Sequence, residues 1–170
     1  MTPRKGHDVL VEALALVADL RWTCTIAGSL DRAPEMVVMV RERIAAHGLG
    51  DRIALIGEAT DMAPLYGAAD IFVLPSRYEG YGMAFAEALQ QGLPVIGTAT
   101  GAIPEVVPSS AGILVPPDDV AALAAALRRL MIDHAARCRL AEGAVIAAKD
   151  LPRWDETARC VAAVLQGIKS

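Results

Sequence analysis

The sequence predicts an α/β fold in which a mainly parallel sheet carries helices on both faces. Short apolar runs typical of buried strands alternate with longer segments whose apolar residues recur at helical spacing. Glycine, proline and serine stand between these runs, where turns are expected. This alternation is the pattern of strand–helix–strand units, whose strands pair in parallel because the helix carries the chain back across the sheet.

The first part of the chain is expected to contain three helices and three strands. Apolar residues at helical spacing, or helix start and stop signals such as Asp61 and His47-Gly48, define the helices. The expected helices are His7 to Asp19, Pro34 to Ala46 and Met62 to Ala68, and the expected strands are Trp22 to Ala27, Arg52 to Ile56 and Asp70 to Leu74.

The second part is expected to contain two strands and four helices, the later helices following the start signal Pro116-Pro117-Asp118. The strands are Pro94 to Gly97 and Gly112 to Val115, and the helices are Met83 to Gln91, Asp119 to Asp133, Ala135 to Lys149 and Arg153 to Gln166. Ligands of parallel sheets bind beyond the carboxyl ends of the strands. The turns at Gly28, Gly57, Pro75-Ser76 and Thr98 should therefore share one ligand-binding rim.

Size and composition exclude several classes of protein. The chain has 170 residues, enough for one domain with a core, and its net charge is −4, which argues against nucleic acid as a partner. It contains no apolar run of about 18 residues that would span a membrane, and no signal peptide is visible. These features favour a cytoplasmic protein.

The cysteine and histidine residues fit structural roles. Cys24, Cys138 and Cys160 are widely spaced and odd in number, which argues against a disulfide framework or a structural zinc site. His7, His47 and His134 show no paired acid and no metal-ligand spacing. We therefore expect no metal and no cofactor.

The segment from Glu79 to Glu87 carries the strongest chemical signal. It follows a predicted buried strand and places Gly80 and Gly82 before a helix-compatible run. A glycine turn at the start of a helix exposes backbone N–H groups, which form an anion site. Glu87, two turns into that helix, is better placed to accept hydrogen bonds from hydroxyls such as those of a ribose. The pattern suits a nucleoside diphosphate that carries a sugar.

The same segment resembles a known family. The run from Pro75 to Gly82, with Glu87-Ala88 and Gln91-Gly92-Leu93-Pro94-Val95, is similar to retaining glycosyltransferases of the two-Rossmann-domain (GT-B) type, nearest to family 4 (group 1) with its Glu-x7-Glu motif. Further matching blocks cover nearly the whole chain: Lys5-Gly6, Ala27-Gly28-Ser29, Gly101-Ala102-Ile103-Pro104-Glu105 and Gly112-Ile113-Leu114-Val115-Pro116-Pro117. The resemblance implies that residues 1–170 form one Rossmann-like C-terminal domain that binds the nucleotide sugar.

The resemblance also implies roles for individual residues. Glu79 would contact the donor sugar near the reacting carbon, and its charge would stabilise an oxocarbenium-like transition state. Lys5 would neutralise the diphosphate, and Glu87 would bind the ribose hydroxyls. The backbone of Gly80, Tyr81, Gly82 and Met83 would offer N–H groups to the sugar and diphosphate, while Gly57-Glu58 would flank the nucleobase. Glu105 is left outside catalysis.

Two family features are missing from this sequence. Family members begin this domain with a strand and a Gly-Arg-Leu-like loop, and they carry an N-terminal acceptor-binding domain before it. The missing strand would be central in the sheet, so its absence should leave unpaired backbone groups on a neighbouring strand. The isolated chain is expected to bind a nucleoside diphosphate weakly, without turnover.

Three alternatives for function and partners stay open at this point. The same fold could serve as a non-catalytic nucleotide-sugar-binding or interaction module, with the apolar face left by the absent domain favouring a homo-oligomer. It could also belong to a related enzyme such as a sugar-nucleotide epimerase. A peripheral membrane contact through the absent domain is a further alternative.

Overall fold

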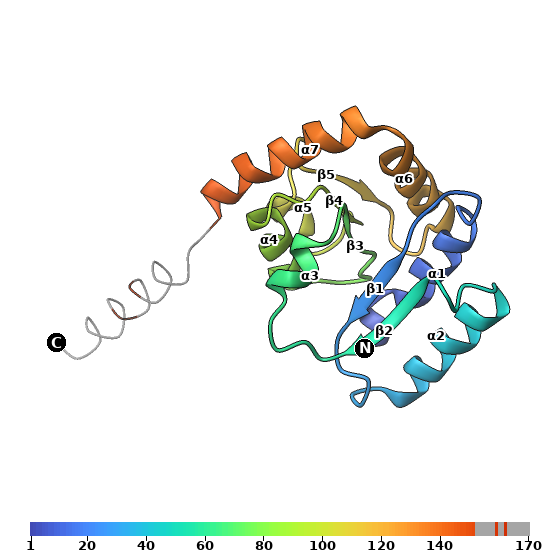
Figure 1. Ribbon diagram of the computed structural model, residues 1–170. Coiled ribbons are helices and arrows are strands. Elements are labelled where there is room, and N and C mark those ends of the chain that lie inside the picture. The colour runs from blue at the N-terminus through green and yellow to red at the C-terminus, as the bar shows by residue number, and fades with distance from the viewer. Residues whose placement is uncertain (152–158, 160–161, 163–170) are drawn as a thin grey trace.

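The computed structural model describes residues 1–151, 159 and 162 of the chain (Figure 1). The helix expected from Arg153 to Gln166 falls almost entirely outside the described residues, as does Cys160. In the part of the chain that is described, no helix is both long and apolar enough to cross a membrane.

The strands are all parallel, as expected, but they form two sheets rather than one. Strand β1 (Cys24–Ala27) pairs with β2 (Ile53–Gly57), while β4 (Val95–Thr98) lies between β3 (Phe72–Leu74) and β5 (Gly112–Val115). Among the described residues no strand pairs with the second edge of β1 or of β3. An unpaired edge on a strand of the sheet was expected from the sequence, and in the described residues β1 and β3 each have one such edge.

Helices connect the strands and cover both faces of the sheets. The two short 3-10 helices are η1 (Pro3–Lys5) and η2 (Ala148–Asp150), and the α-helices are α1 (His7–Ala15), α2 (Pro34–Ala46), α3 (Ala63–Gly67), α4 (Met83–Gln90), α5 (Ile103–Val106), α6 (Val120–Ile132) and α7 (His134–Ala147). Local sequence fixes several helix ends. The carboxylates of Asp119 and Asp133 each accept a backbone hydrogen bond of 2.8 Å in the first turns of α6 and α7.

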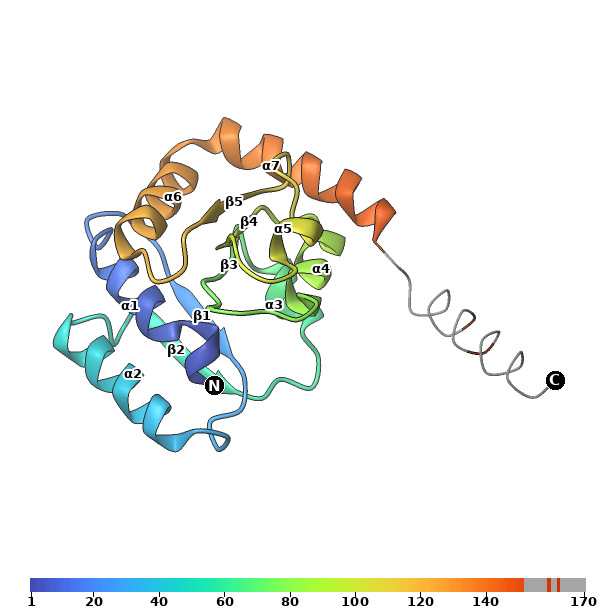
Figure 2. The same cartoon turned by 180° about the vertical axis from the view of Figure 1, so that it is seen from behind.

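Two apolar clusters fill the space between helices and strands. The first joins buried residues of α1, α2 and α6 to β1, β2 and Ile96 of β4, and the second joins α3, α4, α5 and α7 to β3 and Val95 of β4. The same grouping is visible in the ribbon from both sides (Figures 1 and 2). All four residues of β4 are buried, because this strand is paired on both edges and covered on both faces.

The first residues of the chain connect the rims of the two sheets. The Met1 ammonium donates a hydrogen bond to the carbonyl of Ser29, just beyond β1. Farther along, the carbonyl of Arg4 accepts a hydrogen bond of 2.8 Å from the N–H of Arg77, just beyond β3. The carboxyl ends of β1 and β3 therefore lie at the same rim, as the sequence predicted.

Candidate functional site

The loop between β3 and α4 carries the Glu79 motif and is fixed by hydrogen bonds to residues at and after the end of β4. The hydroxyl of Thr98, at the end of β4, donates to the carbonyl of buried Ser76. The N–H of Ala102 donates to the carbonyl of Glu79 over 3.0 Å, and the Thr100 hydroxyl donates to the carbonyl of Arg77 over 3.2 Å. The loop is thus fixed by Thr98, at the end of β4, and by residues that directly follow this strand.

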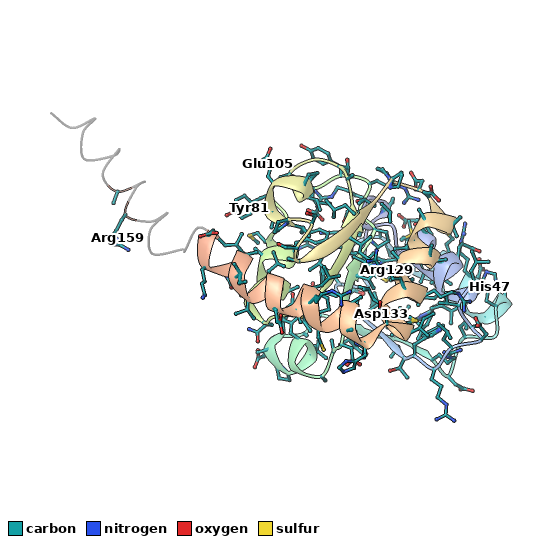
Figure 3. The ribbon with its side chains drawn as sticks, turned by 90° about the horizontal axis from the view of Figure 1, so that it is seen from above. His47, Tyr81, Glu105, Arg129, Asp133 and Arg159 are labelled. Atoms are coloured by element: carbon teal, nitrogen blue, oxygen red, sulfur yellow. The ribbon has the colours of Figure 1, made fainter. Side chains whose placement is uncertain are left out.

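The glycine turn is open, as an anion-binding turn must be. Gly82 adopts the left-handed region (φ 80°) directly before α4, and no side chain caps the first amides of that helix. A Cβ added at Gly80 would meet nothing within 4 Å. Tyr81 and Met83 are about half exposed beside the turn. Tyr81 projects from the same side of the molecule as Glu105, far from His47 (Figure 3).

Glu79 and Lys5, two of the predicted site residues, are brought into direct contact. The Lys5 ammonium donates to Glu79 Oε1, and the Ser76 hydroxyl donates to the same oxygen over 3.0 Å. Glu79 is buried, with 7% of its surface exposed. Burying a carboxylate is costly unless it is paired, and here both partners are supplied by the rim itself. The sequence placed both residues in the site but did not predict that they pair.

The backbone around Lys5 explains why this side chain reaches the loop. Gly6 adopts φ 67°, and a Cβ at this position would lie 2.0 Å from the carbonyl oxygen of Pro75. Only glycine lets the chain pass this close to the β3–α4 loop while turning into α1. This close approach places Lys5, one residue earlier, within reach of Glu79.

Glu87 lies on the exposed face of α4 and has its own partner. The Tyr66 hydroxyl, from α3, donates to Glu87 Oε2 over 3.0 Å. Tyr66 is buried, and desolvation together with the neighbouring Glu87 carboxylate raises the pKa of its hydroxyl, so it stays a hydrogen-bond donor at neutral pH. Sequence reasoning missed Tyr66, because no local pattern links it to a helix 21 residues away.

Arg77 is a second residue that the sequence reasoning did not single out. Its guanidinium binds the carboxylate of Asp8 on α1 over 2.8 Å and that of Asp118 over 2.7 Å, and it also donates to the carbonyl of Pro3. Burial would raise the pKa of Asp8, but the hydrogen bond and charge of Arg77 hold it below its ordinary value. Arg77 thus ties the motif loop to α1 and to the loop before α6.

A large cavity opens beside these residues. It has a volume of about 1440 Å³ and is lined at the rim by Lys5, Gly28, Glu58, Tyr66 and Ala84, among others. Glu87 lies three residues after Ala84 and therefore on the same side of α4. Glu79 is not among the lining residues. Neither Glu87 nor residues 80–83 of the glycine turn are among them either. The structure therefore places Lys5 at the cavity, and it links Glu79 and Glu87 to the cavity through their partners Lys5 and Tyr66.

Histidines and metal-ligating groups have no role at this rim that the structure reveals. His7 begins α1 and is buried. His47, directly after α2, has Nε2 2.9 Å from Glu12 Oε2, a paired acid that the sequence had not indicated because Glu12 lies 35 residues away on α1. Cys24 and Cys138 are free thiols in β1 and α7. In the described ranges, no group of three or more histidine, cysteine or acidic residues could hold a metal ion.

A parallel α/β domain with a glycine turn and an uncapped helix start at its ligand rim is the kind of domain found in glycosyltransferases of the GT-B fold. The chain belongs to the family described as glycosyl transferases group 1, whose model matches residues 1–133. That match covers most of the described chain, including the whole Glu79 motif.

Individual relatives agree with this family. The chain is 33% identical over 178 residues to the lipopolysaccharide core biosynthesis mannosyltransferase LpsB of Rhizobium meliloti, covering 97% of the chain and 49% of that protein. HepE of Anabaena, solved in complex with UDP and glucose, superposes with a TM-score of 0.90 at 25% identity, covering 97% of the chain and 45% of HepE.

A third relative is a solved C-terminal domain. The C-terminal domain of the group 1 glycosyl transferase LpcC from Francisella tularensis superposes with a TM-score of 0.79 at 27% identity, covering 88% of the chain and 80% of that domain. The chain therefore spans about half the length of LpsB and HepE but most of an isolated C-terminal domain.

Proposed function

We propose that this chain is the donor-binding, C-terminal half of a retaining glycosyltransferase, which moves a hexosyl group from a nucleoside-diphosphate sugar to an acceptor hydroxyl. The observation that supports it most directly is the open glycine turn at the start of α4, which follows Glu79 and its partner Lys5 and precedes Glu87 in the helix. HepE, whose structure holds UDP and glucose, shares this fold at a TM-score of 0.90.

The diphosphate is assigned to the turn and to Lys5. The first amides of α4 have no intrahelical partner and point out of the helix start, where the helix dipole also favours an anion. Lys5 adds a full positive charge and is partly exposed, so it can reach a ligand. Lysine and helix amides together can stabilise the charge of a leaving nucleotide, so the proposal requires no metal.

Donor binding has to reorganise the Lys5–Glu79 ion pair. A diphosphate entering the turn competes for the Lys5 ammonium, while Glu79 keeps the hydrogen bond from Ser76. Released from Lys5, the Glu79 carboxylate would face the sugar, where negative charge stabilises a developing oxocarbenium ion. The unliganded pair thus keeps the acid neutralised until an anionic donor takes the lysine.

The ribose is assigned to Glu87. Its carboxylate accepts one hydrogen bond from Tyr66 and retains oxygen lone pairs that can accept from the two ribose hydroxyls. The cavity is also lined by Glu58, which follows Gly57 at the end of β2, and this part of the rim would flank the base.

Sugar transfer by the whole protein would also require a binding site for the acceptor. The relatives LpsB and HepE are about twice as long as the chain, and the remaining half is assigned to the acceptor-binding domain. Orienting two reactants supplies several kcal/mol of barrier reduction. We therefore expect the 170-residue chain to bind the nucleotide and not to transfer the sugar.

Isothermal titration calorimetry with UDP, GDP and ADP tests the proposed binding. We expect one of the three to bind with a dissociation constant in the millimolar range or below, and Glu87→Ala to weaken that binding about tenfold or more through lost charged hydrogen bonds. Glu42→Ala, which removes an exposed acid from α2, is the matched control and should leave the constant unchanged.

The outcomes separate the proposal from its alternative. No heat with any of the three nucleotides at millimolar concentration would contradict donor binding. Tight binding that Glu87→Ala leaves intact would place the nucleotide elsewhere. Binding in this chain, together with no sugar transfer when the chain is joined to an acceptor domain of a relative, would support a non-catalytic module of the same fold.

A further inference from the structure

The side chain of Arg77 starts from a fixed point between two segments of the rim. Its N–H donates to the carbonyl of Arg4 over 2.8 Å, and its carbonyl accepts from the hydroxyl of Thr100 over 3.2 Å. Arg77 lies two residues before Glu79, in the loop between β3 and α4. The direction in which its guanidinium leaves this loop is therefore set by backbone contacts with both segments.

The guanidinium contacts the chain on both sides of Lys5. Its two terminal nitrogens bind the two carboxylate oxygens of Asp8 over 3.1 and 2.8 Å, and one of them also donates to the carbonyl of Pro3 over 2.5 Å. Because a guanidinium is planar and rigid, a contact with both carboxylate oxygens fixes orientation as well as distance. Arg77 thus holds both ends of the short segment from which the Lys5 ammonium reaches Glu79.

Asp118 adopts a strained backbone conformation beside Arg77. Among the residues that the structure describes, it is the one non-glycine residue with a positive φ, which is 59°. Its carboxylate accepts a hydrogen bond of 2.7 Å from Arg77 Nε, the guanidinium nitrogen that Asp8 does not use. The Asp118 side chain is 56% exposed, and an ion pair so exposed adds little stability. We therefore assign this pair to the orientation of the guanidinium.

Arg77 itself does not reach the proposed ligand. It is not among the residues that line the cavity, whereas Lys5 is. Its positive charge is already shared between the carboxylates of Asp8 and Asp118. The Lys5 side chain is 27% exposed and remains accessible to an anion. An effect of Arg77 on an anionic ligand is therefore expected to pass through the position of Lys5.

We propose that Arg77 is the positioning residue for Lys5, with Asp118 fixing the orientation of the guanidinium. By anchoring the chain on both sides of Lys5 to the β3–α4 loop, Arg77 keeps the ammonium beside Glu79, where an entering diphosphate can compete for it. The consequence for ligand binding rests on the proposed function, in which Lys5 binds the diphosphate. The positioning itself can be measured without a ligand.

Two variants and one matched control test this role. Arg77→Met keeps the apolar part of the side chain but removes every guanidinium contact. Asp118→Asn removes the charge while retaining a residue type that tolerates a positive φ. The control is Arg128→Met. Arg128 also binds both oxygens of a carboxylate, that of Asp19, and a backbone carbonyl, that of Leu16, but near the opposite end of α1.

NMR of the lysine side chains reports on the position of Lys5. The sequence contains only Lys5, Lys149 and Lys169, so the Lys5 signal is assigned by its loss in Lys5→Met. The two protons on Cε of a lysine held in one conformation differ in chemical shift, whereas rapid rotation averages them. We expect separate shifts for Lys5 in the wild type and in Arg128→Met, and one averaged shift in Arg77→Met. Separate shifts that persist in Arg77→Met would overturn the proposal.

Calorimetry then measures what the positioning contributes to ligand binding. With whichever of UDP, GDP and ADP binds the chain, we expect Arg77→Met to weaken binding about tenfold and Asp118→Asn about threefold, because a displaced lysine makes a poorer charged hydrogen bond to phosphate. In a Lys5→Met background, Arg77→Met should weaken binding no further. Arg128→Met should leave the affinity unchanged, even where urea unfolding shows an equal loss of stability.

The outcomes distinguish failure of this inference from failure of the proposed function. Equal losses of affinity from Arg77→Met with and without Lys5, or from Arg77→Met and Arg128→Met, would refute the positioning role. Binding that Lys5→Met leaves intact, or no binding at all, would contradict the assignment of the diphosphate to Lys5, while the NMR comparison would still decide whether Arg77 positions this side chain. If Arg77→Met does not fold, Asp118→Asn replaces it: the separation of the Lys5 shifts should shrink, and an unchanged separation would refute the role.

Discussion

At the scale of single residues, the rim is built from pairs whose members lie far apart in the sequence. Lys5 meets Glu79 and Tyr66 meets Glu87, so each of the two acids of the motif has a dedicated partner. The motif and Lys5 were predicted from the sequence, because glycine spacing and resemblance to a family can both be recognised within short segments. The pairings were not, because they depend on how α1 and α3 pack against the β3–α4 loop and α4.

Tyr66 should act as a positioning residue for Glu87. Tyr66→Phe keeps the buried ring but removes the hydrogen bond of 3.0 Å, worth about 1 kcal/mol. We expect nucleotide binding, measured by calorimetry, to weaken about fivefold. If Tyr66 acts only by positioning Glu87, adding Tyr66→Phe to the Glu87→Ala variant should weaken nucleotide binding no further. Equal losses in both backgrounds would show that Tyr66 contacts the nucleotide itself or only maintains the fold.

At the scale of elements, most helices and strands were predicted, with differences at their ends. Helix α2 and strand β5 match the expected bounds, whereas α1 ends at Ala15 rather than Asp19. Strand β1 begins at Cys24, two residues later than expected, because its ladder starts where Cys24 meets the carbonyl of Arg52. Such ends are set by pairing partners and not by local pattern.

Helix α5 was missed altogether because it is only four residues long. Its sequence, Ile103 to Val106, carries a proline in the first turn and no apolar period. The division of the sheet has a different origin. The sequence shows each strand but not which strands pair, so the local patterns could not predict that β1–β2 and β3–β4–β5 form separate sheets.

Replacement by alanine should destabilise the protein at one glycine of the motif region and leave its stability nearly unchanged at another. At Gly101 (φ 54°) a Cβ would lie 2.2 Å from the Glu79 carbonyl oxygen, so Gly101→Ala should lower the free energy of unfolding by about 2 kcal/mol or more. Gly80 has open space around it and no positive φ, so Gly80→Ala should change stability by no more than about 0.5 kcal/mol.

Nucleotide affinity should separate the two glycines further. The methyl group at position 80 would enter the space assigned to the ligand, so we expect roughly tenfold weaker binding in a fully stable protein. Gly50→Ala, at another open glycine without positive φ, is the control for both urea unfolding and calorimetry. Unchanged affinity in Gly80→Ala would argue that the turn does not face the bound nucleotide.

At the scale of the whole molecule, β4 and the first seven residues hold the parts together. Ile96 belongs to one apolar cluster and Val95 to the other, so β4 connects the two cores. The N-terminal segment joins the two rims through Ser29 and Arg77. The candidate ligand site and the junction that residues 1–7 form between the two rims therefore share this segment, and a change in it should affect the whole fold.

Lowering the pH should test the junction formed by residues 1–7, because this segment contains the buried His7. Burial, with the nearby N-terminal ammonium and Lys5, lowers the pKa of His7 from 6.5 to about 4. The unfolded chain therefore binds a proton more readily than the folded one, so stability is highest above pH 6.5 and falls as the pH drops towards 4. Integrating the shift gives a loss of about 2 kcal/mol between pH 7 and pH 5.

Urea unfolding at a series of pH values measures this loss. Asp8, whose pKa is lowered by Arg77, also loses its stabilisation in acid, but only below its unfolded value of 3.8, so the window from pH 7 to 5 reports His7. His7→Gln should flatten the pH dependence in this window, while His134→Gln, at an exposed position, should keep it. A wild-type stability that stays constant from pH 7 to 5 would show that His7 is not buried as a neutral side chain, and the junction would then be more open to water than the structure indicates.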